Sequence, residues 1–251
     1  MLLTHTWVIF LRQMRQLLRN PVWVIFGLTQ PILYLALFGP LLKNVSGGGL
    51  GGDNAWKIFV PGLLLQLVIF GAGFAGFGII GELREGVVDR QRVTPASRLS
   101  LILGRTLSNV VTLGVQAVLL TVVAIPFGLR ASFAGVVVSV VLVCILALGL
   151  SAASYSAGLI LKDEDSFAPM IQSISLPLML LSGVLLPMTL APAWLKHISD
   201  ANPMRYLVDG SRDLFRGDFA TRNVALGAGL TIVMSALLAW WGTRTFQKSS
   251  E

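Results

Sequence analysis

Long, uninterrupted apolar segments constrain this chain more than any other feature of its sequence. There are six, at about residues 22–42, 58–80, 107–129, 133–161, 167–188 and 224–246. A helix needs about 20 apolar residues to cross the hydrocarbon core of a bilayer. Their hydrophobicity is continuous rather than alternating, which favours helices over a membrane barrel. The sequence therefore predicts an all-α integral membrane protein with six transmembrane helices.

The composition excludes a soluble enzyme. Only 12% of the 251 residues are charged and 55% are hydrophobic, whereas soluble domains average about 25% charged residues. More Lys and Arg residues fall on the side of the two termini, which predicts a multi-pass protein of the cell membrane with both termini cytoplasmic. This bias also accounts for the net charge of +7 without nucleic-acid binding. We expect one membrane domain over residues 1–251, comprising a helix at 1–20, a charged segment at 82–98 and an outer loop with short helices at 188–222.

The first twenty residues are predicted to form an amphipathic helix on the cytoplasmic surface of the membrane. Large apolar residues recur at helical spacing, and basic residues occupy the other face. Asn20-Pro21 is expected to end this helix. It serves either as a basic anchor that fixes topology or also as a partner contact. Its characteristic residues are Trp7, Arg12, Arg15 and Arg19.

No acidic residue lies in the interior of a predicted span. Carriers driven by protons or sodium generally need an ionisable group there, so its absence argues against an ion-coupled carrier. The spans do contain uncharged polar residues such as Gln30, Gln66 and Gln172. These side chains either join helices or contact a substrate.

The chain lacks recognisable catalytic, ATP-binding and metal-binding motifs. The Gly-rich segment 46–52 is not followed by Lys-Ser or Lys-Thr, as a phosphate loop would be. His5, His197 and the single cysteine, Cys144, lie far apart in the sequence. We therefore expect a chain that is not an enzyme and holds no cofactor of its own.

A charged segment between the second and third spans mixes acidic and basic residues at helical spacing. Pro95 is expected to end its helix. A short charged helix projecting from the membrane suits docking onto a soluble partner. The alternative is a solvated connector.

Residues 86–98 of this segment read Gly-Val-Val-Asp-Arg-x-Arg-x-x-Pro-x-Ser-Arg. This pattern resembles the coupling segment of type-2 ABC exporter permeases, closest to the daunorubicin/multidrug-resistance permease group. The resemblance implies a coupling helix that docks on a separate ATP-binding subunit, where ATP and Mg would bind. Gln91 departs from the pattern, since the drug-exporter group often has an aromatic residue there. The implied docking residues are Glu82, Arg84, Glu85, Gly86, Asp89, Arg90, Arg92, Pro95 and Arg98.

The loop before the last span is predicted to contain two short helices. Asn202 can cap a helix whose first residue is Pro203 and which Gly217 can close. Pro192 and Trp194 indicate another helix just before it. The family resemblance implies re-entrant helices that shape an outer gate, with Trp194, Asn202, Pro203 and Tyr206 as its residues. The alternative is a structured cap over the outer leaflet.

Together these features predict the permease subunit of an ATP-driven exporter of hydrophobic or amphipathic molecules, paired with an identical or related permease. An ion-coupled carrier and a non-transporting membrane assembly or sensor protein are the alternatives. Seven residues are predicted to line the substrate path from the helix face they occupy and their position in the span: Gln30, Tyr34, Gln66, Phe70, Phe74, Gln172 and Met179.

Overall fold

The computed structural model describes residues 2–20, 22–45, 54–85, 98–184, 188 and 191–248. These residues form α-helices joined by short connections, and the described ranges contain no β-strand. In chain order the helices are α1 (Leu2–Arg19), α2 (Val22–Val45), α3 (Asn54–Gly73), α4 (Gly76–Arg84), α6 (Arg98–Ala124), α7 (Phe133–Leu161), α8 (Glu164–Leu181), α9 (Ala193–Asp200), α10 (Pro203–Arg216) and α11 (Arg222–Lys248).

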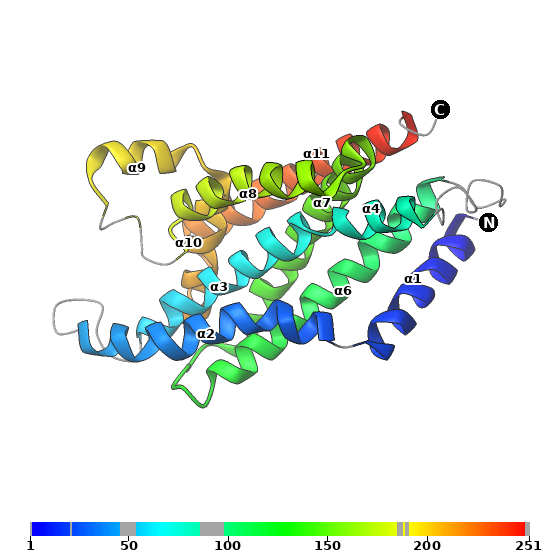
Figure 1. Cartoon of the computed structure of the whole chain (residues 1–251). Coiled ribbons are helices and arrows are strands. Elements are labelled where there is room, and N and C mark those ends of the chain that lie inside the picture. Colours follow the sequence, from blue (N-terminus) through cyan, green and yellow to red (C-terminus); the bar gives the residue numbers. More distant parts are fainter. Residues whose placement is uncertain are drawn as a thin grey trace.

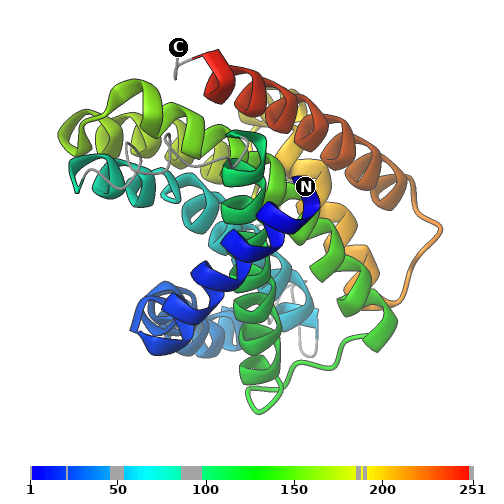
Figure 2. The same ribbon diagram turned by 90° about the vertical axis from the view of Figure 1, so that its right-hand side faces the viewer.

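The long helices run along one axis of an elongated bundle (Figure 1). The N- and C-terminal helices begin and end at one end of this bundle, which we call the terminal end. The short helix α9 lies at the opposite end, the far end. Figure 2 shows α1 lying across α6 at the side of the bundle.

Four helical segments are long and apolar enough to cross a membrane: Ala55–Arg84, Leu99–Ala124, Phe133–Leu161 and Arg222–Thr245. A fifth is possible if α1 and α2, which meet at 65°, are counted as one bent span. The all-helical, multi-pass class is thus confirmed, while six separate spans stay a prediction. The fourth predicted span matches α7, and the third extends further towards the N-terminus than predicted because α6 already begins at Arg98.

The second predicted span is interrupted between α3 and α4. Ser154 on α7 bridges this break, because its hydroxyl donates to the Gly73 carbonyl and accepts from the Gly76 N–H at 2.9 Å. A Cβ atom at Gly76 would lie 2.4 Å from the Phe167 ring. The small side of Gly76 therefore permits α7 and α8 to approach this span closely.

Helix α7 lies in the middle of the bundle and packs closely against α11. A Cβ atom at Gly149 would lie 2.6 Å from Cα of Ser235, so glycine permits the two backbones to touch. Small residues at helix contacts are typical of membrane bundles, where packing rather than hydrophobicity drives association. Large apolar side chains of α2, α6 and α11 remain exposed, among them Phe26, Val118, Leu237 and Trp240. Exposure on this scale suits contact with lipid rather than water.

The connection between α7 and α8 is tight. Lys162 ends α7 in the left-handed conformation, with φ of 55°. Asp163 then caps α8 by accepting hydrogen bonds from the Ser166 N–H at 2.9 Å and the Ser166 hydroxyl at 2.8 Å. These hydrogen bonds lower the pKa of the Asp163 carboxyl.

Candidate functional site

A buried ion pair joins α4 and α6 at the terminal end. Arg105 on α6 binds the carboxylate of Glu82 on α4. Gln13 on α1 donates to the other oxygen of Glu82 at 3.5 Å. Arg105 is almost fully buried. The third predicted span begins at about residue 107, which leaves Arg105 in the preceding loop. The structure corrects this, because α6 already begins at Arg98 and so includes Arg105.

The last residue of α4 contacts the start of α8. The guanidinium of Arg84 lies 3.2 Å from the carboxylate of Glu164 and 3.7 Å from that of Asp163. Both partners are partly exposed, so this pair adds little to stability. It does fix the end of α4 beside the start of α8.

The predicted docking residues fall into two groups. Glu82 and Arg84 bind other residues of this chain, so they support the ends of the segment rather than offer free charges. Glu85 is exposed at the end of α4. Gly86, Asp89, Arg90, Arg92 and Pro95 lie outside the described residues, and Arg98 is the first residue of α6. The coupling helix itself therefore stays a prediction.

A cavity of about 1000 Å³ lies between α1, α2, the broken helix α3–α4 and α6. Its apolar lining includes Phe70, Phe74 and Phe77, whose neighbouring ring centroids are 6.1 and 5.7 Å apart. Its polar lining consists mainly of amides: Gln13, Gln16, Asn20, Gln30, Gln66, Asn109 and Gln116.

The structure brings together part of the predicted substrate path. Gln30, Gln66, Phe70 and Phe74 all line the cavity. Tyr34 lies beside it and its hydroxyl accepts a hydrogen bond from Gln30 at 3.4 Å. Gln172 and Met179 on α8 are not among the lining residues; Gln172 is exposed and Met179 is buried in the main hydrophobic core.

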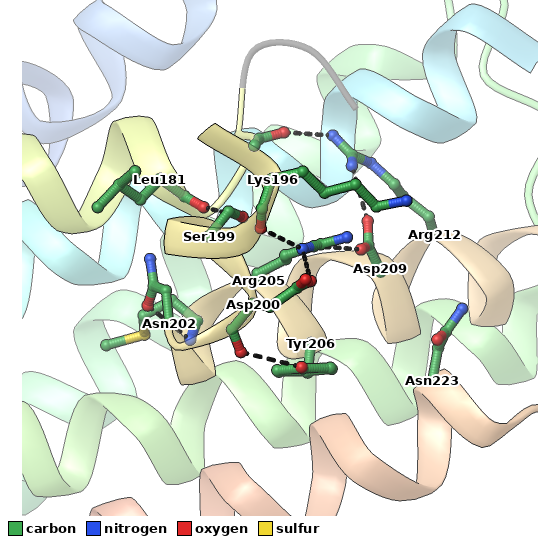
Figure 3. Close-up of polar contacts among 12 residues, drawn as sticks. Leu181, Lys196, Ser199, Asp200, Asn202, Arg205, Tyr206, Asp209, Arg212 and Asn223 are labelled. Carbon is green, nitrogen blue, oxygen red and sulfur yellow. Dashed lines mark hydrogen bonds and ion pairs between the residues drawn. The ribbon is translucent and has the colours of Figure 1, made fainter. Parts of the chain in front are cut away.

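A second polar cluster holds the predicted outer helices at the far end (Figure 3). Arg205 on α10 binds the carboxylate of Asp200 on α9, and its Nε lies 3.6 Å from Asp209. The Lys196 carbonyl accepts a further hydrogen bond from Arg205 at 3.4 Å. These contacts fold α9 back onto α10.

Arg212 connects the same cluster to the transmembrane helices. Its guanidinium donates to the carbonyls of Ile58 on α3, at 3.0 Å, and of Gly183 after α8, at 2.7 Å. Its Nη1 binds Asp209 at 3.0 Å (Figure 3). A single buried cation thus fixes α10 against both α3 and α8.

The predicted gate residues have different roles in this cluster. Asn202 caps α10 by accepting from the Met204 N–H at 3.0 Å, and its amide donates to the Leu178 carbonyl at 2.9 Å. Pro203 is the first residue of α10, and Tyr206 donates to the Asp200 carbonyl at 3.0 Å. Trp194 is exposed on α9. Three predictions for α10 are confirmed: Asn202 caps it, Pro203 is its first residue, and Gly217 ends it with φ of +98°.

The predicted interfacial helix forms over Leu2–Arg19; of its apolar residues, Phe10, Leu11 and Met14 are partly covered, whereas Trp7 and Leu18 are exposed. Its close contact with α6 is at Gly104, where a Cβ atom would lie 2.8 Å from Ile9 and 2.9 Å from the Thr6 carbonyl. Trp7 is 56% exposed and stacks on Phe10 at 5.2 Å. Arg12, Arg15 and Arg19 are exposed on the remaining surface. An exposed tryptophan among exposed arginines is typical of a membrane interface.

The sequence interpretation did not single out Arg105, Arg205, Asp209 or Arg212. One signal was available at the far end, because Arg205 with Asp209 and Asp209 with Arg212 are spaced four and three residues apart. Such spacing brings opposite charges together on a helix. The pairing of Arg105 with Glu82 joins two helices and has no comparable local signal.

Comparison with known proteins identifies the family. The model of the family described as ABC-2 type transporter matches residues 4–215. Among curated proteins, the daunorubicin resistance ABC transporter permease protein DrrB1 of Streptomyces coeruleorubidus is 25% identical over 244 residues, covering 94% of this chain and 83% of the relative. The putative transport permease ycf38 of Cyanophora paradoxa is 28% identical, covering 80% of this chain and 70% of the relative.

The inner membrane transport permease YadH of Escherichia coli is 25% identical, covering 78% of this chain and 77% of the relative. The named relatives are transport permeases, which agrees with a chain that is not itself a catalyst. The family match extends from α1 to the last turn of α10 and so includes both polar clusters and the cavity. This chain belongs to the ABC-2 type transporter family.

Proposed function

We propose that this chain is the membrane-spanning permease subunit of an ATP-binding-cassette exporter of the cell membrane. It would pair with a second permease, identical or related, and two separate ATP-binding subunits would supply ATP hydrolysis with Mg. Family membership and the permease relatives support this proposal. The exporter direction is supported by the relative whose name describes drug resistance.

The observation that carries the proposal is the position of α4 and α6. These helices flank residues 86–97, are joined by Glu82 and Arg105, and continue into walls of the cavity. A displacement of the segment between them would therefore be transmitted to the walls of the cavity through the contact of Glu82 with Arg105. We propose that ATP-binding subunits dock there, with Asp89 and Arg90 at the contact and the terminal end in the cytoplasm.

The cargo in this proposal is a hydrophobic or amphipathic molecule. Aromatic rings and neutral amides dominate the cavity lining, and its charged residues Arg105 and Glu164 bind Glu82 and Arg84. An ion-coupled carrier would need an ionisable group available to the transported ion. At the far end, α9 and α10 would act as the outer gate, held closed by the contacts of Arg205 and Arg212.

The proposal is tested by purifying the full chain from its native host in mild detergent. An ATPase with a phosphate loop should co-purify in an amount comparable to the permease. The double variant Asp89→Ala/Arg90→Ala should lower the amount of that partner about tenfold or more. The double variant Asp218→Ala/Arg222→Ala, at exposed far-end positions, should retain it. Absence of any such ATPase from the wild-type preparation would refute the exporter assignment.

A further inference from the structure

We propose that one face of α1 binds anionic phospholipids of the membrane leaflet at the terminal end of the bundle. This arginine face consists of Arg12, Arg15 and Arg19, and its occupant is a lipid with a negatively charged headgroup, such as phosphatidylglycerol. None of the three arginines lines the cavity. The lipid site is therefore separate from the proposed substrate path, and it does not depend on what the cargo is.

The fold fixes the direction of the arginine face. Arg12, Arg15 and Arg19 are spaced three and four residues apart, which places them within about 60° of one another around a helix of 3.6 residues per turn. All three are exposed. Another side of the helix packs on α6, where a Cβ atom added at Gly104 would lie 2.8 Å from Ile9. This contact keeps the arginines turned outwards from the bundle.

The arginine face has no counter-charge in the described part of the chain. None of its arginines forms an ion pair there, and residues 1–52 contain no acidic residue, since Asp53 is the first. At the same end, Arg84 and Arg105 do bind carboxylates of α8 and α4. A guanidinium binds phosphate oxygens in the same two-pronged way as a carboxylate. Lipid phosphates can therefore supply the counter-charge that the described residues do not.

The neighbours of the arginine face favour a lipid over an acidic soluble protein. Trp7 and Leu18 are 56% and 78% exposed and lie along one edge of this face. Large apolar side chains beside basic ones suit the boundary between acyl chains and headgroups. On α11, towards the same end, Arg244 lies 4.5 Å from the ring centroid of the exposed Trp240. Two helices thus present tryptophan together with arginine, as expected at headgroup level.

The test measures lipid binding to the full chain in a neutral detergent. Phosphatidylglycerol and phosphatidylcholine with the same acyl chains are titrated separately, and native mass spectrometry counts the bound lipids. Phosphatidylglycerol should bind about fivefold or more tightly, the factor expected from one basic residue near an anionic headgroup. Glycerol phosphate carries the charge without acyl chains and should not displace it at equal concentration. Displacement would overturn the assignment to a lipid.

Two triple variants test the arginine face directly. Arg12→Gln/Arg15→Gln/Arg19→Gln removes its charge and should weaken phosphatidylglycerol about fivefold or more, while phosphatidylcholine binding stays unchanged. Arg12→Lys/Arg15→Lys/Arg19→Lys keeps the charge and should retain most of the preference. The lysine variant therefore separates loss of charge from any change in the helix.

A matched control removes three exposed positive charges at the far end: Lys196→Gln/Arg216→Gln/Arg222→Gln. It should leave the preference for phosphatidylglycerol intact. The proposal is overturned if both lipids bind the wild-type chain equally, or if the control and the glutamine variant of the arginine face behave alike. It is also overturned if that glutamine variant loses a co-purifying ATPase while its lipid binding is unchanged, because the face would then bind a protein. Lipid binding itself is measured without ATP or a partner subunit.

Discussion

Single buried cations determine how the two ends of the bundle are held. Arg212 satisfies two backbone carbonyls and Asp209, and Arg105 binds Glu82. A buried guanidinium is tolerated only when such partners replace its water. Removing it would leave those partners buried without a donor, so the loss should exceed that of an exposed ion pair.

Arg212→Met tests this difference at the far end. We expect it to lower the free energy of unfolding by about 2–3 kcal/mol, because a charged hydrogen-bonding group is lost and its acceptors stay buried. Arg216→Met is the matched control: its side chain is 41% exposed and lies 3.6 Å from Asp213. Its cost should stay below about 1 kcal/mol. Chemical unfolding of both variants in detergent measures the two values, and equal losses would contradict the role given to Arg212.

At the scale of elements, the break between α3 and α4 is held together by a residue of another helix. Ser154 partners the Gly73 carbonyl and the Gly76 N–H, which the break removes from the regular helical pattern. Phe74 at the break lines the cavity, and α4 leads to residues 86–97. The break therefore lies between the cavity and the proposed docking segment.

Ser154→Ala should destabilise the fold through this break. It leaves a buried donor and a buried acceptor unpaired, so we expect a loss of about 1–3 kcal/mol. Ser182→Ala is the control, since its buried hydroxyl bonds the Met179 carbonyl of its own helical turn at 2.7 Å. That substitution should cost less, because it removes a local contact and joins no two helices. Thermal unfolding distinguishes them, and a smaller loss for Ser154→Ala would contradict the bridging role.

The contact between α7 and α11 gives a second prediction at this scale. Gly149→Ala places a methyl group 2.6 Å from the Ser235 backbone and should cost about 1–3 kcal/mol as the helices separate. At Gly229 on α11 no atom lies within 4 Å of an added Cβ. Gly229→Ala should therefore be neutral or stabilise by up to about 1 kcal/mol through helix propensity. Unfolding midpoints in the same detergent compare them, and a neutral Gly149→Ala would refute the close contact.

On the scale of the whole molecule, local signals were readable from the sequence and contacts between helices were not. The Asn202 cap, Pro203 and Gly217 predicted α10 because each acts on its own backbone. Gln66 and Phe70, both predicted to line the substrate path, do line one cavity, since four residues separate them on one helix face. Gln172 lies away from that cavity because contacts with α3, α7 and α10 determine how α8 is placed.

The described residues form a cavity between the helices and polar clusters towards both ends of the bundle. Arg105 and Glu82 lie at the terminal end, and Arg205 and Arg212 lie at the far end. This arrangement places the proposed energy input and the proposed gate at opposite ends of the bundle (Figure 1). The helices of the described residues connect the proposed site of energy input with the proposed gate. The energy itself would come from ATP hydrolysis in the separate ATP-binding subunit.

The most direct test of this account is the rate of ATP hydrolysis by the co-purified complex in nanodiscs. Because Asp89→Ala/Arg90→Ala weakens docking, less ATP-binding subunit stays bound, and we expect the rate per permease to fall about tenfold or more. A tenfold loss of binding corresponds to about 1.4 kcal/mol of docking free energy. Asp218→Ala/Arg222→Ala should leave the rate unchanged. If the Asp89→Ala/Arg90→Ala preparation hydrolysed ATP at the wild-type rate, this would contradict the claim that the ATP-binding subunit docks at residues 82–98.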